Sequence, residues 1–223
     1  MKHTVWGIRD LWARRALLTG LGAVTANAAL SAATQSAPSA TPFRPARHPE
    51  DAWLDRIPGK HRVVVDAITP DGVREAAQFV SNIFTGNKAG YSLDDGEVAV
   101  VFGLRHWASA FAFNDEIWAK YGAAIAEGAH FTNPESTAAP TVNPMNGAPR
   151  RPLEALAKRG VHFAICNLST RRISREATRG GGDAEAVYQS LLVSALPNAH
   201  FVPAGVVGVT RAQEYGYSVL YVG

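Results

Sequence analysis

The sequence has little cysteine and little charge. Cys166 is the single cysteine, which excludes a disulfide framework within the chain and a zinc site built from several cysteines. Charged residues make up 18% of the 223 residues, where about a quarter is usual in globular proteins. Because 47% of the residues are hydrophobic, the chain can bury a core, which excludes a disordered protein. The length corresponds to one domain with appendages.

Several motifs of catalysis and cofactor binding are missing as well. The sequence contains no GxGxxG, GxxxxGK[ST], GxSxG, HExxH or CxxCH pattern. These absences argue against the usual nucleotide-binding loops, a serine-esterase elbow, a zinc-protease helix and a covalently attached haem. We therefore predict no cofactor and no metal.

The excess of positive charge is confined to the N-terminus. The chain has 22 basic and 19 acidic residues, and four bases and one acid lie in the first 34 positions, so 18 of each sign remain beyond them. A nucleic-acid partner requires a concentrated basic face. The rest of the chain is formally neutral, so we expect no nucleic-acid partner.

Residues 1–40 have the order of an export signal. Basic residues are followed by a small-residue apolar stretch, ALLTGLGAVTANAALS at 16–31, and Arg14-Arg15 directly precedes it. This layout is typical of the twin-arginine export route and predicts a periplasmic protein with a cleaved signal. The alternative is a transmembrane anchor, which is disfavoured because spanning takes roughly 20 strongly apolar residues. We expect no other membrane contact.

Residues 41–60 are rich in proline and predict a linker, in which Trp53, Leu54 and Ile57 could attach to the domain surface. Beyond it, residues 61–223 alternate between apolar runs and helical spacing. Strands are predicted at 61–68, 97–104, 161–165, 200–202 and 217–222, and helices at 72–83, 113–122, 152–159, 184–196 and 206–213. Residues 123–150 predict an irregular insertion, and residues 167–182 are polar and end in a run of three glycines.

Five apolar strands separated by helices predict an α/β fold with a mainly parallel five-stranded sheet covered on both faces. The expected architecture is a flavodoxin-like three-layer sandwich with strand order 2-1-3-4-5. In such sheets, ligands bind beyond the carboxyl ends of the strands, near the point where the strand order reverses. That rule selects residues 69–72, Arg105-His106-Trp107 and Cys166-Asn167.

Cys166 is the principal candidate for chemistry. It follows an apolar strand, and Arg171, Arg172, Arg175 and Arg179 come within the next thirteen residues. Positive charge or a helix N-terminus favours the nucleophilic thiolate. The alternative is a buried cysteine that packs as a small apolar side chain. The arginines could bind an anion or belong to a solvated loop.

His106 lies between Arg105 and Trp107 at another strand end. It could form a thiolate–imidazolium pair with Cys166 if the two strands bring them together. Other roles for His106 are an acid or base, a metal or haem ligand, or a capping hydrogen-bonder. Trp107 belongs to an aromatic group that favours a core or subunit interface over stacking on a ligand.

The C-terminal part of the chain resembles a known family. The segments LEALAKRGVHFAICNLSTRRIS and HFVPAGVVGVTRAQEYGYSVLYV are similar to the DsrE/DsrF-like sulfur-relay proteins. Shared features are a strand ending in Cys166, the turn Val202-Pro203-Ala204-Gly205-Val206, and Arg211, Gln213 and Gly216-Tyr217. RHWASAFAFNDEIWAKYG, residues 105–122, is similar to exported, twin-arginine-tagged members of the group. The resemblance implies a flavodoxin-like sheet, an oligomer, and a persulfide on Cys166.

Two functions follow as predictions. In the first, Cys166 accepts sulfane sulfur from a small donor or a relay protein. Arg171 and Arg172 then steer the donor, His106 assists, and Arg105, Trp107 and Asn167 complete the substrate site. In the second, the protein is a non-enzymatic periplasmic binding or interaction protein whose crevice at 105–107 and 166–172 holds a small ligand, and Cys166 is structural. Either protein is expected to be a homo-oligomer.

Overall fold

The computed structural model describes residues 42–133, 136, 138–147 and 150–223. The predicted export signal at 1–40 lies outside these residues and stays a prediction. Within the described ranges, no helix is long and apolar enough to cross a membrane.

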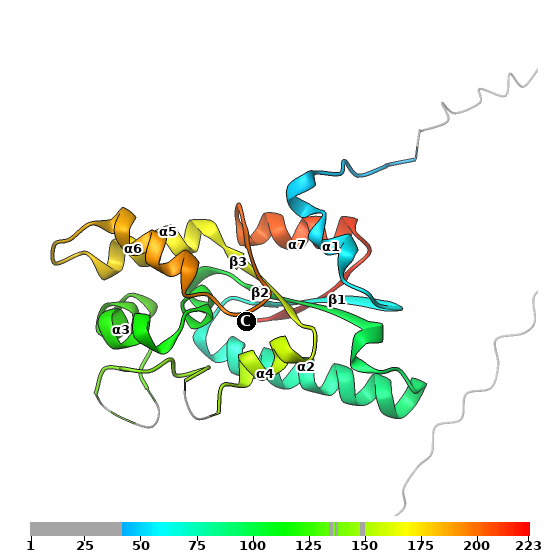
Figure 1. The fold of residues 1–223 in the computed structure, drawn as a ribbon, viewed down its shortest axis with the longest axis horizontal. Helices are drawn as coiled ribbons and strands as arrows, with labels where there is room; N and C mark the ends of the chain where they lie inside the picture. The colour runs from blue at the N-terminus through cyan, green and yellow to red at the C-terminus, as the bar shows by residue number, and fades with distance from the viewer. Residues whose placement is uncertain (1–41, 134–135, 137, 148–149) are drawn as a thin grey trace, which may run out of the picture. The chain divides into compact units, whose positions relative to one another are not determined.

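The centre of the fold is a five-stranded sheet in which every pair of neighbours is parallel (Figure 1). Its strands are β1 (His61–Ala67), β2 (Val98–Leu104), β3 (His162–Cys166), β4 (Ala199–Val202) and β5 (Ser218–Val222). β1 and β2 contain near-continuous valine-rich runs, as expected for strands buried on both faces. The predicted α/β class with a parallel sheet between helices is confirmed.

The strand order differs from the expected one. The sheet runs β4-β3-β2-β1-β5, so β1 lies between β2 and β5 and not between β2 and β3. The chain adds strands in one direction from β1 to β4 and then crosses back to the far side of β1. Because right-handed crossovers in opposite directions use opposite faces, the last helix is on a different face from the earlier ones. The predicted order 2-1-3-4-5 is wrong, because hydrophobic periodicity in the sequence indicates which residues are buried and not which strands are adjacent.

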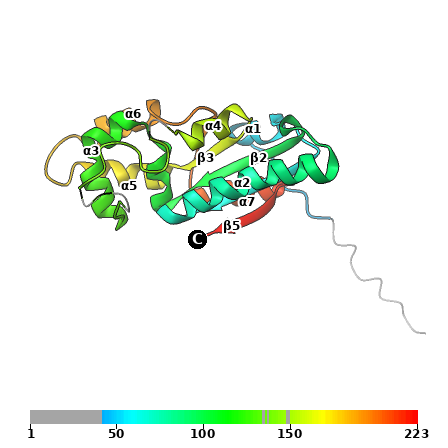
Figure 2. The same ribbon diagram turned by 90° about the horizontal axis from the view of Figure 1, so that it is seen from below.

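Helices cover both faces of the sheet (Figures 1 and 2). α1 (Trp53–Arg56) and α7 (Gly205–Glu214) lie on one face, and α2 (Pro70–Tyr91) and α4 (Pro152–Lys158) lie on the other. α3 (Asp115–Ala129), α5 (Asn167–Ala177) and α6 (Ala184–Val193) gather at one end of the sheet, at the left of Figure 1. Three 3-10 helices, η1 (Pro49–Asp51), η2 (Asp95–Glu97) and η3 (His106–Ala112), complete the described elements.

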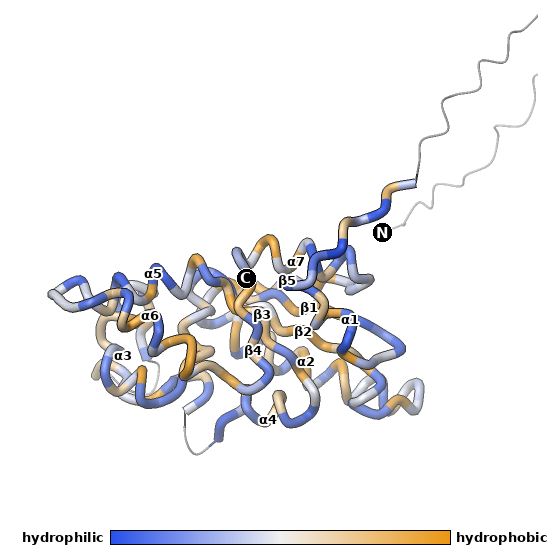
Figure 3. Tube along the Cα trace, turned by 45° about the horizontal axis from the view of Figure 1, so that its top comes forward, coloured by the Kyte–Doolittle hydropathy of each residue, from blue (hydrophilic) through white to orange (hydrophobic). Residues whose placement is uncertain are grey.

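The two faces of the sheet belong to two separate cores. Alternate residues such as Val65, Phe102 and Ile165 face the larger core, under α2, α4 and η3. Val64 and Ala164 face the smaller core, under α1 and α7. Figure 3 shows the hydrophobic residues concentrated along the strands. This alternation decides on which face each strand-end side chain lies.

Several helices differ from their predicted extents. α2 continues through Gly86 and Gly90, which face open space, and ends at Tyr91. The C-cap residue Ser92 has a left-handed backbone, and its N–H donates to the carbonyls of Asn87 and Lys88. α3 includes the first residues of the predicted insertion. α5 was not predicted at all.

The rest of the insertion is irregular but built around a buried asparagine. Asn143 Nδ2 donates to the carbonyls of Phe111 and Phe113, at 2.9 and 2.7 Å. Its Oδ1 accepts from the backbone N–H groups of Met145 and Asn146. These bonds tie the described part of the insertion to η3 and satisfy backbone groups that no helix or strand satisfies.

The end of the predicted linker is part of the folded unit. Trp53, Leu54 and Ile57 are buried in the smaller core. The Trp53 indole lies parallel to the His200 imidazole, with ring centroids 3.9 Å apart. The predicted attachment of these three residues to the domain is therefore observed, and η1 and α1 belong with the sheet.

Candidate functional site

A row of side chains crosses the carboxyl end of the sheet on the face of the smaller core. Gly103 of β2 pairs with Asp66 of β1 on one side and with Ala164 of β3 on the other. Side chains alternate along a strand, so Asp66, Arg105 and Cys166 share a face with Ala164. Cys166 in turn pairs with Val202 of β4. The Arg105 guanidinium is directed across β1, to Asp66 and toward the Tyr221 ring of β5, and so away from β3 and Cys166.

Asp66 and Arg105 form an ion pair in this row. Arg105 Nε lies 2.9 and 3.0 Å from the two carboxylate oxygens of Asp66. The Asp66 side chain is 5% exposed and that of Arg105 is 23% exposed. Asp66 was missed from the sequence, although a lone carboxylate within the apolar run HRVVVDAI is a signal, because a buried charge requires a partner.

The first turn of α7 lies directly over the row. A Cβ at Gly205 would collide with the Arg105 side chain, and one at Gly208 would contact the Val202 side chain at 2.8 Å. Glycine at these two positions therefore permits the close approach of helix to sheet. Ala204, the N-cap, supplies no side-chain hydrogen bond. The N-terminus of α7 therefore lies against the Arg105 side chain.

Cys166 is at the start of a second helix. It is the N-cap of α5, and its Sγ accepts the backbone N–H of Ser169 at 3.4 Å. The residue is 6% exposed. The Ser169 N–H at the α5 N-terminus is therefore directed at this sulfur.

His106 belongs to a different group of side chains. Its backbone is left-handed, with φ 55°, and its Nε2 lies 3.5 Å from Arg172 Nη1. Burial lowers the pKa of His106 below its usual 6.5, and the charges of Arg172 and Arg105 lower it further. His106 is therefore neutral near pH 7. Within the described ranges no hydrogen bond joins it to Cys166, so the expected thiolate–imidazolium pair is not observed.

Arg172 lies between His106 and an aromatic side chain. Its guanidinium carbon is 4.1 Å from the centre of the Trp107 ring. Trp107 is buried and touches the larger core, in line with the predicted core role. Arg172 Nε and Nη2 are buried and have no hydrogen-bond partner among the residues that the structure describes.

Arg171 and Asn167 hold α6 against α5. Arg171 forms an ion pair with Glu185 at 3.1 Å and lies over the Tyr188 ring, 3.9 Å from its centre. Asn167 Oδ1 accepts the Tyr188 hydroxyl at 2.8 Å. Both predicted substrate-binding residues are thus engaged in helix packing.

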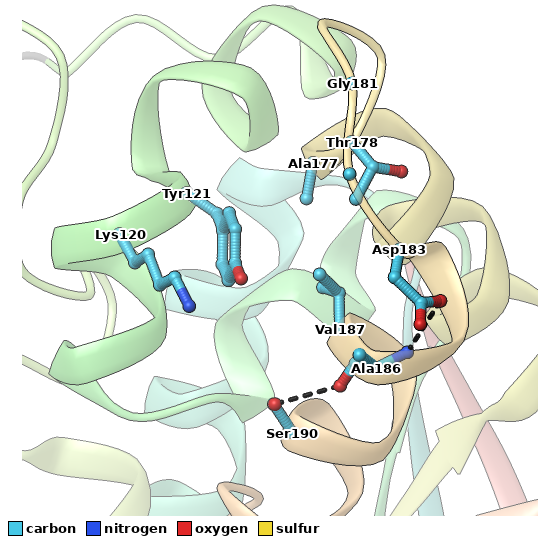
Figure 4. Close-up of a pocket in the computed structure, with 10 residues that line it drawn as sticks. Lys120, Tyr121, Ala177, Thr178, Gly181, Asp183, Ala186, Val187 and Ser190 are labelled. Atoms are coloured by element: carbon cyan, nitrogen blue, oxygen red, sulfur yellow. Dashed lines mark hydrogen bonds between the residues drawn. The ribbon is translucent and has the colours of Figure 1, made fainter.

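Surface hollows lie away from the row. One of about 220 Å³ is between α3, the glycine turn after α5, and α6, with Lys120 and Tyr121 opposite Val187 (Figure 4). Its polar side chains are used within the helices: Asp183 caps α6, and Ser190 donates to the Ala186 carbonyl. A shallower one of about 810 Å³ is at the amino ends of β1 and β5. Over the described residues, no three metal-ligating side chains cluster.

Comparison with known proteins assigns no family. No protein-family model matches the sequence, and no curated protein matches it. The structure of the protein of unknown function MTH1491 from Methanobacterium thermoautotrophicum is similar over 73% of this chain and 99% of that one, at 15% identity and a TM-score of 0.40. A likeness this weak establishes neither family nor function. The DsrE/DsrF-like resemblance stays a prediction.

Proposed function

We propose that the protein carries sulfane sulfur as a persulfide on Cys166, in the periplasm. The observation that carries the proposal is the hydrogen bond from the Ser169 backbone N–H to Cys166 Sγ at the N-terminus of α5. Thiolates and persulfide anions are both stabilised by such a position.

The proposed step is a displacement at sulfur. The Cys166 thiolate attacks the outer sulfur of thiosulfate, the S–S bond of thiosulfate breaks, and sulfite leaves with the electron pair of that bond. Cys166 retains one additional sulfur as a persulfide anion. No oxidant is consumed, because the sulfane sulfur moves from one sulfur nucleophile to another.

The surroundings of Cys166 limit the donor. Because the residue is 6% exposed, a small inorganic donor reaches the sulfur more readily than a bulky disulfide. His106 is left out of the proposed step, because it lies against Arg172 and, over the described residues, forms no hydrogen bond with Cys166. Arg171 and Asn167 are omitted from the donor site because α6 engages both.

Intact mass spectrometry tests the proposal. Purified protein is incubated with thiosulfate or polysulfide, with Cys166→Ser alongside. We expect a gain of about 32 Da that a reductant removes and that the variant lacks, because persulfidation is reversible. A wild-type protein without the adduct, whose thiol reacts with iodoacetamide only after denaturation, would exclude the persulfide.

The alternative is a non-enzymatic binding protein with a structural Cys166. The burial of Cys166 and its role as the N-cap of α5 favour this alternative. It predicts that Cys166→Ser leaves folding and ligand binding unchanged, and that no sulfur adduct forms. The mass measurement therefore separates the two functions.

We also propose a homo-oligomer that forms through the free edge of β5. β5 pairs with β1 on one side, exposes Val219, Leu220 and Tyr221, and carries no charged residue. Such an edge offers backbone hydrogen bonds to a strand of another copy, and a charge on it opposes pairing. Sedimentation velocity should show a smaller species for Leu220→Lys. An unchanged size would exclude this edge.

A further inference from the structure

Arg172 differs from the other partly buried arginines. Arg62, Arg105, Arg159 and Arg211 each have a carboxylate partner. Over the ranges that the structure describes, Arg172 forms no ion pair, and its Nε and Nη2 are the buried side-chain polar atoms without a hydrogen-bond partner. Leaving charged donors buried and unpaired is costly, so binding an acceptor at these two atoms would be favourable.

The two unpartnered nitrogens form one recognition edge. Nε and Nη2 lie on the same side of the planar guanidinium, and this pair of parallel N–H donors matches two oxygens of one oxyanion. The third nitrogen, Nη1, is used separately, 3.5 Å from His106 Nε2. The unused donors are therefore arranged for bidentate binding and not scattered.

The surroundings hold this edge in place. The guanidinium is stacked 4.1 Å from the Trp107 ring centre, and Trp107 is packed against Gly128 of α3. Over the described residues, no carboxylate neutralises the positive charge of Arg172. The other arginine that acts on His106, Arg105, is paired with Asp66. A rigid, unneutralised guanidinium loses little entropy when it binds an anion.

We infer that the Nε/Nη2 edge of Arg172, stacked on Trp107, is a binding site for a small oxyanion. The chemical class is a sulfate, phosphate or carboxylate group that presents two oxygens to one guanidinium. The site requires no thiol chemistry and so stands apart from the proposed function of Cys166. Because the two nitrogens are shielded from solvent, the anion enters only when the side chains covering them move.

Calorimetry and thermal unfolding test the inference by measuring how sulfate, phosphate and acetate bind to the full chain. Sodium chloride keeps the ionic strength constant. Arg172→Lys keeps the charge and removes the edge, and Arg171→Lys is the matched control on the adjacent, exposed position. We expect saturable binding by the wild type and Arg171→Lys, and affinity at least about tenfold weaker for Arg172→Lys. The Cys166→Ser variant should bind as the wild type does.

The geometry of the anion is read from the same data. Stronger binding of sulfate and phosphate indicates a tetrahedral ligand, and stronger binding of acetate indicates a carboxylate. Equal stabilisation of all variants would reflect general salt effects and would overturn the inference. So would the absence of saturable binding by the wild type, which would leave water as the partner of the edge.

A second measurement is made on the wild-type protein. The His106 ring resonance is titrated by NMR with and without the anion, and His106→Gln serves only to assign it. An anion on Arg172 neutralises one of the charges that depress the pKa of His106, so binding should raise that pKa. An unchanged His106 titration at saturating anion would place the bound ion elsewhere and overturn the inference.

Discussion

Arg105 Nε donates to both carboxylate oxygens of Asp66, across the pairing of β1 with β2. The bond links the centre of the sheet to the segment that leads into η3. It also keeps the Arg105 side chain beneath the first turn of α7, where Gly205 contacts it. The position of the Arg105 side chain at the carboxyl end of the sheet therefore depends on the Asp66 carboxylate inside the sheet.

Asp66→Asn should lower the free energy of unfolding by about 1–3 kcal/mol, because it leaves the partly buried Arg105 charge without a counterion. Urea denaturation measures the loss. Asp55→Asn is the matched control, since Asp55 pairs with Arg62 at 3.3 Å but is 60% exposed. We expect the control to lose less than about 0.5 kcal/mol. Equal losses in both variants would contradict a special role for the pair.

Alanine at two helical glycines should have opposite effects. Gly205→Ala places a methyl group against Arg105 and should cost about 1–3 kcal/mol through overpacking. Gly90→Ala, in α2 with open space around it, should stabilise the protein by about 0.5–1 kcal/mol through helix propensity. Chemical denaturation of both variants checks the signs. A neutral Gly205→Ala would mean that α7 does not approach the sheet closely.

The fold was predictable where the signal is local. Valine-rich runs predicted β1 and β2, because burial on both faces leaves a continuous apolar stretch. α5 was missed because three of its buried positions hold Ser169, Thr170 and Ser174, which hide the helical period around Ile173. The strand order depends on which side of β1 the last crossover reaches, and no local pattern reports that.

The site was predictable in position but not in its pairing. The rule for strand ends selected Arg105 and Cys166, and the alternation of side chains along β2 and β3 places both on one face. The direction of His106 depends on its left-handed backbone, with φ 55°, which turns the side chain toward Arg172. A glycine in a sequence often indicates a left-handed backbone, whereas a histidine gives no comparable signal.

The cap on α5 gives a stability test for Cys166. Serine at position 166 retains an acceptor for the Ser169 N–H, and alanine does not. Cys166→Ser should therefore be more stable than Cys166→Ala by about 1 kcal/mol, the usual value of an N-cap. Urea denaturation of the two variants gives the difference. Equal stabilities would show that the sulfur is not a significant cap.

The histidine pair under Trp53 predicts a specific dependence on acid. His162 Nδ1 and His200 Nε2 lie 2.9 Å apart, and both rings lie beneath the Trp53 indole of α1. Burial lowers the pKa of both, and that of His200 falls to about 4 because the charges of His162 and Arg56 add to burial. The native state therefore favours neutral rings.

Stability should fall as the pH drops from 6.5 toward 4. In this window the unfolded chain takes up protons that the native His200 does not, so the unfolded state is stabilised relative to the native state by up to about 3 kcal/mol. Above pH 6.5 both states are neutral and this contribution to the pH dependence ends. Below about pH 4 the native ring is protonated too, and the loss levels off.

Unfolding free energies at pH 7.5, 5.5 and 4.5 measure this effect. His200→Phe keeps an aromatic ring under Trp53 and cannot titrate, so it should be less sensitive to acid than the wild type over this range. His61→Phe, at an exposed position of β1, controls for the loss of a histidine and should keep the wild-type slope. If His200→Phe also kept the wild-type dependence of stability on pH, the acid sensitivity would come from carboxylates elsewhere and not from this pair.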